Sequence, residues 1–203
     1  MAVSSNQSKH ESTNPVQQRL ISRFHAEVVR FVGVVDPVRI LEVGCGEGFV
    51  LSALAEAGVQ AELVGFDLDE GAVAAARQRL GDTAEIIQAD VNDAPDVAGR
   101  FGIVMMLEVL EHLPDTPAAM DMLEKLAGPG GHLLLSVPNE PLFRGLNLLR
   151  LKNVGRWGSD PDHCQHWTSR AFARLVGERF EIVAKGSAFP WTMLLVRVPL
   201  AAS

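Results

Sequence analysis

The feature that most constrains this chain is an apolar run that leads directly into three closely spaced glycines. The run covers residues 38–43, and Gly44, Gly46 and Gly48 follow on alternate positions. A continuous apolar run of this length is typical of a buried parallel strand. Glycine has no Cβ and tolerates positive φ, so the backbone after the strand is able to turn sharply and approach a ligand before a helix begins. The pattern therefore predicts a strand, a ligand-binding loop and a helix.

Length and composition favour a single domain with a buried core. The chain has 203 residues, of which 47% are hydrophobic, and we expect one domain over residues 15–203 after a mobile, polar segment 1–14. The net charge of −7 argues against a nucleic-acid partner. Two cysteines provide no disulfide scaffold, and no apolar run reaches the roughly 18 residues of a membrane span. We therefore expect a cytoplasmic protein without membrane insertion.

Apolar runs alternate with helical patterns along most of the chain. A first helix is predicted from Pro15 to Gly33, and further helices over 49–57, 70–80, 116–126 and 169–178. The predicted strands are 38–43, 61–66, 84–89, 101–107, 131–137, 180–187 and 192–198. Strict alternation predicts an α/β fold with a mostly parallel sheet, helices on both faces, and ligands at the carboxyl ends of the strands.

Two connections depart from this pattern. The last two strands are separated only by residues 188–191, which is too short for a parallel crossover, so the last strand is predicted to be antiparallel. Residues 140–167 form a connection much longer than the usual 2–6 residues. We interpret this insertion as a candidate substrate lid.

The spacing of the glycines separates two kinds of nucleotide loop. The dinucleotide fingerprint is Gly-x-Gly-x-x-Gly, and Phe49 stands where its third glycine would be. Together with Glu42, the string Leu-Glu-Val-Gly-Cys-Gly-Glu-Gly over residues 41–48 closely resembles the first motif of class I S-adenosylmethionine-dependent methyltransferases. The resemblance implies a Rossmann-like seven-stranded sheet in the order 3-2-1-4-5-7-6 and S-adenosylmethionine as cofactor.

The resemblance also implies roles for residues at the following strand ends. An acid at position 67 is able to accept hydrogen bonds from both ribose hydroxyls, although a surface turn aspartate is the alternative. Asp90 would meet the adenine amino group, with a helix cap or turn as its alternative, and the backbone at Glu108 would meet the cofactor's ammonium group. The cofactor-binding residues expected from this resemblance are Glu42, Gly44, Cys45, Gly46, Gly48, Asp67, Leu68, Asp90, Val91, Leu107 and Glu108.

Residues 160–167 hold the strongest candidates for chemistry on the acceptor. His163 and His166 are our candidates for binding or deprotonating the acceptor, because a hydroxyl acceptor must lose a proton to become nucleophilic. The alternative is that both histidines hydrogen-bond only to backbone. A metal site built from these histidines and a carboxylate is less favoured, and we expect no metal.

A basic, amphipathic stretch lies in the same insertion. Arg144, Arg150, Lys152 and Arg156 occur among leucines without an intervening acid. This stretch would hold an anionic or amphipathic small-molecule substrate, touch a membrane surface, or form a packed lid helix with solvated cations.

The sequence thus favours methyl transfer to a small molecule, with O-methylation preferred over N- or C-methylation. A silent S-adenosylmethionine-binding module is an alternative class. A nucleotide-dependent oxidoreductase is less favoured because glycine is missing at position 49.

Overall fold

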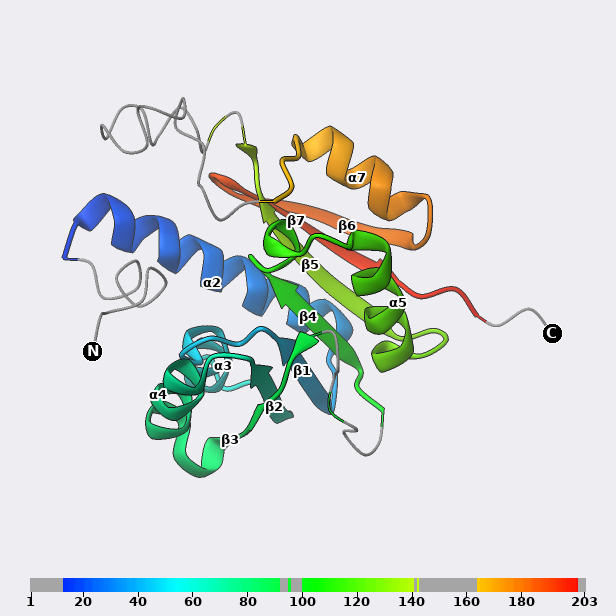
Figure 1. Ribbon diagram of the computed structural model, residues 1–203. Helices are drawn as coiled ribbons and strands as arrows, with labels where there is room; N and C mark the ends of the chain where they lie inside the picture. Colours follow the sequence, from blue (N-terminus) through cyan, green and yellow to red (C-terminus); the bar gives the residue numbers. More distant parts are fainter. Residues whose placement is uncertain (1–12, 92–94, 96–99, 141, 143–163, 201–203) are drawn as a thin grey trace. The chain divides into compact units, whose positions relative to one another are not determined.

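The structure is a computed structural model that describes residues 13–91, 95, 100–140, 142 and 164–200 (Figure 1). The chain divides into two compact units, residues 1–105 and 106–203. The boundary falls within strand β4, Ile103–Leu107. The seven strands are hydrogen-bonded in the order β3-β2-β1-β4-β5-β7-β6, which confirms the predicted order.

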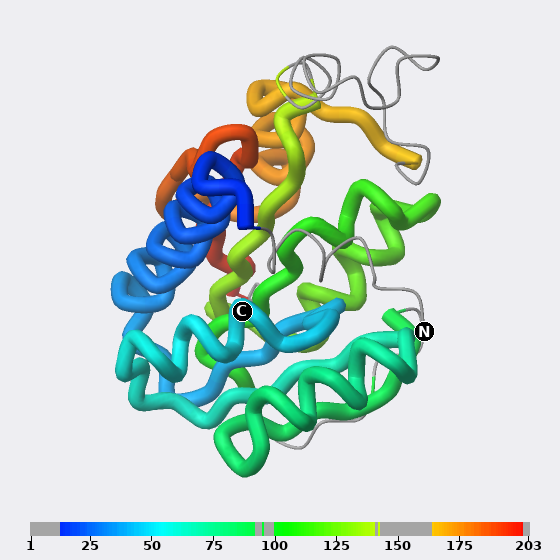
Figure 2. The backbone as a smooth tube through the Cα atoms, turned by 90° about the vertical axis from the view of Figure 1, so that its left-hand side faces the viewer, coloured from blue at the N-terminus to red at the C-terminus, as the bar shows by residue number. Residues whose placement is uncertain are grey.

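The first unit is a parallel sheet with a layer of helices. Its elements are α2 (Pro15–Val35), β1 (Arg39–Val43), α3 (Phe49–Glu56), β2 (Glu62–Asp67), α4 (Glu70–Leu80), the 3₁₀ turn η1 (Gly81–Thr83) and β3 (Ala84–Gln88). β2 pairs in parallel with both β1 and β3. α3 contacts α2 and α4, and α4 packs on β2 and β3. Figure 2 shows α3 and α4 running beside each other over these strands.

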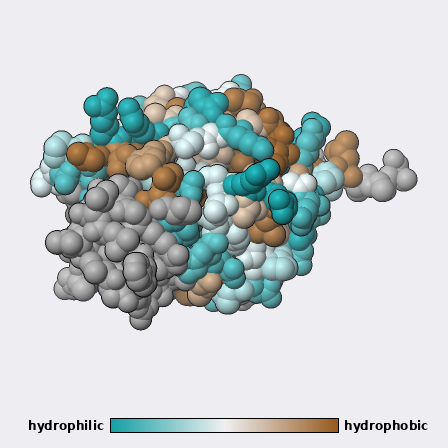
Figure 3. Space-filling model, turned by 90° about the horizontal axis from the view of Figure 1, so that it is seen from above, coloured by the Kyte–Doolittle hydropathy of each residue, from teal (hydrophilic) through white to brown (hydrophobic). Residues whose placement is uncertain are grey.

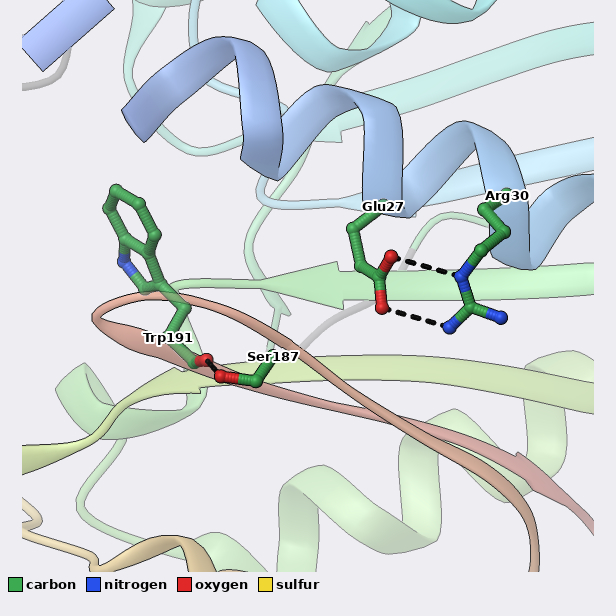
Figure 4. A network of polar contacts seen from close by, with 4 residues as sticks. All are labelled: Glu27, Arg30, Ser187 and Trp191. Carbon is green, nitrogen blue, oxygen red and sulfur yellow. Dashed lines mark hydrogen bonds and ion pairs between the residues drawn. The ribbon is translucent and has the colours of Figure 1, made fainter. Parts of the chain in front are cut away.

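Short polar residues cap two helices of this unit, α2 and α4. Asn14 accepts hydrogen bonds from the backbone of Val16 and Gln17, and Pro15 occupies the first position of α2, where its missing N–H costs nothing. Asp69 caps α4 through a bond of 2.7 Å from the Ala72 N–H. Along α2, Arg30 forms a two-bond ion pair with Glu27 (Figure 4).

The second unit contains the other strands and helices of the described residues. Its elements after β4 are the 3₁₀ turn η3 (Leu110–His112), α5 (Thr116–Ala127), β5 (His132–Pro138), α7 (Ser169–Gly177), β6 (Glu181–Ala188) and β7 (Trp191–Arg197). β7 pairs antiparallel with both β5 and β6, as the short connection predicts. The Ser187 hydroxyl donates to the Trp191 carbonyl across the β6–β7 turn (Figure 4).

The burial of residues along each strand shows whether one or both faces of that strand are covered. β5 and β7 are buried at nearly every position, so both of their faces are covered. β6 alternates between exposed and half-buried residues, as expected of an edge strand with one open face. Hydrophilic residues with smaller hydrophobic groups among them occupy the surface seen in Figure 3.

Candidate functional site

The three glycines after β1 all adopt the left-handed backbone that the sequence predicts for them. Their φ angles are 71° at Gly44, 53° at Gly46 and 76° at Gly48. The N–H groups of Gly44 and Cys45 both donate to the Phe66 carbonyl, at 2.8 and 3.0 Å. The loop is therefore tied to the end of β2, and residues with a side chain would be strained at each of the three positions.

Close packing holds the loop in place on both sides. A Cβ on Gly48 would lie 2.8 Å from Leu80 Cδ1, so the start of α3 is pressed against α4. A Cβ on Gly65 would lie 2.9 Å from Cys45 Cβ, so β2 needs glycine opposite the loop. Burial raises the pKa of the Cys45 thiol, and the nearby Glu42 and Asp67 carboxylates raise it further. Cys45 thus stays protonated, which suits a packing residue and not a nucleophile.

Asp67 joins the end of β2 to the glycine loop. Its Oδ2 accepts from the Gly46 N–H at 2.8 Å, and its Oδ1 accepts from the Asp69 N–H at 3.0 Å. A carboxylate has about four acceptor positions, so each oxygen retains capacity for a further donor. The half-buried carboxylate therefore offers two neighbouring acceptors beside a loop fixed for close approach.

Glu42 is a buried acid directly before the loop. Its side chain is 3% exposed, and its Oε2 has no hydrogen-bond partner among the described residues. Desolvation raises the pKa of Glu42 well above its ordinary value, and the charge of Asp67 adds to the rise. A buried carboxyl oxygen without a partner is rare and unfavourable, so a ligand that brings a donor or a positive charge would satisfy it.

The ends of β2 and β3 meet at the same edge as the loop. The Ala89 N–H donates to the Asp67 carbonyl at 3.0 Å. Leu68 is apolar yet 63% exposed, and its carbonyl accepts from the Gln88 side chain. Asp90 and Val91 follow β3 and are half-buried. Within the first unit, the predicted cofactor residues therefore gather at the carboxyl ends of three adjacent strands.

In the second unit, Glu108 has a backbone conformation that the sequence does not reveal. Its φ is 60°, in the left-handed region that is unfavourable for a residue with a side chain. Its N–H donates to the Ser136 carbonyl at 3.2 Å, and the Ser136 hydroxyl donates to its Oε1 at 3.1 Å. Leu107, directly before it, is buried. Ser136 lies inside a predicted strand, and nothing in its sequence context indicates this role.

The segment that carries His166 is anchored by backbone bonds. The N–H groups of Cys164 and Gln165 donate to the Glu111 carbonyl at 2.8 and 3.0 Å, and the Glu140 N–H donates to the Trp167 carbonyl at 3.1 Å. These bonds therefore tie the segment to η3 at one end and to Glu140 at the other. His166 itself is exposed. Glu111 and Glu140 are both buried acids, which the sequence did not single out as such.

Several predicted residues lie outside the described part of the chain. These are His163 and the basic residues Arg144, Arg150, Lys152 and Arg156. Among the described residues, no group of three or more histidine, cysteine, aspartate or glutamate side chains is arranged to hold a metal ion. No helix in the described residues is long and apolar enough to cross a membrane.

A family model described as "Methyltransferase domain" matches residues 16–184. Among curated proteins, the chain is 35% identical to a ubiquinone biosynthesis O-methyltransferase of Thiobacillus denitrificans over 105 residues, which are 50% of this chain and 44% of that protein. A protein of the same name from Alkalilimnicola ehrlichii is 36% identical over 116 residues, or 55% and 46% of the two chains. The matched part thus spans less than half the length of these relatives.

Solved structures share the fold over nearly the whole chain. A magnesium protoporphyrin IX methyltransferase from Synechocystis, solved with bound SAH, has a TM-score of 0.68 at 22% identity and covers 92% of this chain and 89% of its own. An N-methyltransferase from Bradyrhizobium japonicum, solved with S-adenosyl-l-homocysteine, has a TM-score of 0.70 at 20% identity and covers 97% and 93%. At these identities the likeness concerns the fold.

Proposed function

Because this chain belongs to the methyltransferase domain family, we propose that it transfers a methyl group from S-adenosylmethionine to a small-molecule acceptor. The observation that carries the proposal is the pairing of the Asp67 carboxylate with the glycine loop, at 2.8 Å from Gly46. This arrangement, with the unpartnered oxygen of Glu42 beside it, matches the two features of the cofactor that a protein must recognise: a ribose diol and a positive charge.

The first unit has residues suited to the adenosine part of the cofactor. We propose that the remaining acceptor positions of Asp67 take the two ribose hydroxyls, since both of its oxygens keep capacity beyond their backbone bonds. Leu68 is exposed and apolar, which suits contact with an adenine face. Asp90 and the Val91 N–H are proposed for the adenine edge on the family resemblance.

The acidic residues near the loop suit a cationic ligand. Glu42 is buried with an oxygen that lacks a partner among the described residues, and a cation would favour its ionised form. In the second unit, we propose Leu107 and Glu108 as cofactor-binding residues on the family resemblance. The strained backbone of Glu108 is of the kind found at functional sites.

When bound, S-adenosylmethionine supplies a methyl group that its sulfonium already activates. The protein's part is then to orient the reactants and exclude water. A base is required only if the acceptor must lose a proton, as a hydroxyl must. We propose His163 and His166 for binding or deprotonating the acceptor, since both belong to the long connection after β5.

The preferred acceptor atom is oxygen. The support is the similarity of half of this chain to proteins named as O-methyltransferases. The structural neighbour named as an N-methyltransferase is only 20% identical and does not weigh against this choice. We further propose a small molecule and not a nucleic acid as the acceptor, because the chain carries a net charge of −7.

The test has a binding step and a turnover step. Calorimetry with S-adenosylmethionine and with NAD should give binding of the first alone. The protein should then release S-adenosylhomocysteine with at least one member of a panel of phenols, amines and lipid-like acids. Binding without turnover on any member of a broad panel would favour the silent cofactor-binding module. Binding of NAD alone would overturn the proposal.

A further inference from the structure

A groove on the second unit gathers positive charge away from the residues discussed above. It has a volume of about 500 Å³ and lies between α7 and the β6–β7 hairpin. Three cations line it: Arg170 and Arg174 from α7, and Lys185 from β6. This volume is within the range of small-molecule sites and far exceeds what a single ion needs.

Among the residues that the structure describes, the three cations have no partners of opposite charge. The other two described arginines of this unit are paired: Arg179 bonds to Asp121 and Glu124, and Arg197 bonds to Glu181. Arg170, Arg174 and Lys185 make no ion pair with any other described residue. Although the chain has 25 acidic and 18 basic residues, the described lining of this groove holds three cations and no acid, which suits an anion.

The placement of these cations is unfavourable for folding alone. Arg170 and Arg174 stand four positions apart on one helix, where like charges repel. Arg170 is also the second residue of α7, at the end of the helix whose dipole disfavours positive charge. A bound anion would relieve both effects.

A chain of hydroxyl groups at one side of the groove leaves a donor available. The Asn139 amide donates to the Ser169 hydroxyl at 2.7 Å, and the Ser169 and Thr192 hydroxyls are 2.6 Å apart. Whichever of these two hydroxyls donates to the other, the hydrogen of the second hydroxyl takes no part in the bonds among the described residues. The Ser187 hydroxyl already donates to the Trp191 carbonyl and adds no donor.

We propose that this groove binds a phosphate group, either free or carried by a small molecule. A phosphate carries about −1.5 to −2 charges near neutral pH, which suits three cations better than the single charge of a carboxylate does. Arginine guanidinium groups bind phosphate through paired hydrogen bonds. The site is independent of methyl transfer, since none of its residues belongs to the proposed cofactor or acceptor residues.

The test is calorimetry of the full chain with inorganic phosphate, glycerol 3-phosphate and glycerol at constant ionic strength. Arg174→Gln and Lys185→Gln should each weaken phosphate binding by about tenfold or more. Arg100→Gln and Lys125→Gln are the matched controls, because both residues are exposed and neither lines the groove. Their affinity should stay at the parent value, and all four variants should bind S-adenosylmethionine as the parent does.

The choice of ligands identifies the source of the phosphate. Tighter binding of glycerol 3-phosphate than of inorganic phosphate would indicate a phosphorylated small molecule, and equal binding would indicate the free ion. Failure of both to bind would overturn the proposal. Equal weakening in the groove variants and in the two controls would overturn it as well, because binding would then depend only on net charge.

Discussion

The Oδ2 atom of Asp67 lies 2.8 Å from the backbone nitrogen of Gly46 and accepts its hydrogen bond. One carboxylate oxygen thus fixes the middle of the glycine loop, while the other fixes the turn after β2 through Asp69. A change at either residue should therefore affect both loop geometry and ligand binding.

Asp67→Ala and Gly46→Val should each weaken S-adenosylmethionine binding by about 1–3 kcal/mol. The first removes the proposed ribose acceptor, and the second places a β-branched residue where φ is 53°. Calorimetry measures the affinity, and circular dichroism verifies the fold. Asp82→Ala is the control, because Asp82 is an exposed acid in η1 outside the loop. Unchanged affinity in a folded Asp67→Ala or Gly46→Val variant would place the cofactor elsewhere.

Glu42→Gln should have opposite effects on stability and on binding. Because the folded state raises the pKa of Glu42, the folded protein binds its proton more tightly than the unfolded chain. Stability is therefore lost as pH rises from the ordinary glutamate range towards the raised pKa. Glutamine cannot ionise, so the variant should be more stable than the parent at pH 8. It should nevertheless bind S-adenosylmethionine less tightly by about 1–3 kcal/mol.

Melting temperatures between pH 4.5 and 8 without ligand provide the measurement for Glu42→Gln. Glu85→Gln is the matched control, since Glu85 is an exposed glutamate on β3. Its pH profile should follow that of the parent. A Glu42→Gln variant with the parent's pH profile would contradict the raised pKa that burial gives this carboxyl.

Glu108→Gly should separate stability from activity. Glycine relieves a left-handed backbone by about 1 kcal/mol, which offsets the lost bond from Ser136. The variant should therefore remain folded, and it should transfer methyl groups more slowly if the Glu108 carboxylate, and not only its backbone, acts on the cationic cofactor. Asp36→Gly is a matched control, because Asp36 has a φ of 49° at the end of α2 and lies outside the proposed site. Full activity in Glu108→Gly would exclude a role for the side chain and leave only the backbone contact that the family resemblance implies.

Local signals in the sequence were sufficient for most of the fold. The alternation of apolar runs and helical patterns placed every described strand within two residues of its observed ends, and the short connection 188–191 predicted the antiparallel β7. The glycine spacing predicted the loop, because left-handed backbone at three alternate residues needs glycine there.

Features that depend on tertiary contacts were beyond the sequence. The strain at Glu108 and its bond from Ser136 join residues 28 positions apart, and no local pattern encodes such a pair. The three cations of the groove beside α7, which form no ion pair with another described residue, come from a helix and a later strand. The lid prediction for 140–167 stays a prediction, because most of that range lies outside the described residues.

His163→Ala or His166→Ala should lower turnover by about 10²–10⁴ if that histidine is the base, with cofactor affinity nearly unchanged. His166 belongs to a segment whose backbone is fixed by Glu111 and Glu140, so its removal should not unfold the site. His132→Ala is the control, because His132 begins β5 at the end opposite Asn139.

The measurement is S-adenosylhomocysteine release with an identified acceptor across pH. A base would also shift the acidic limb of the pH profile, whereas a histidine that only orients the acceptor would change KM more than kcat. Turnover at the parent rate in both variants would make the histidines structural, and a base would then be sought among Glu108, Glu111 and His112.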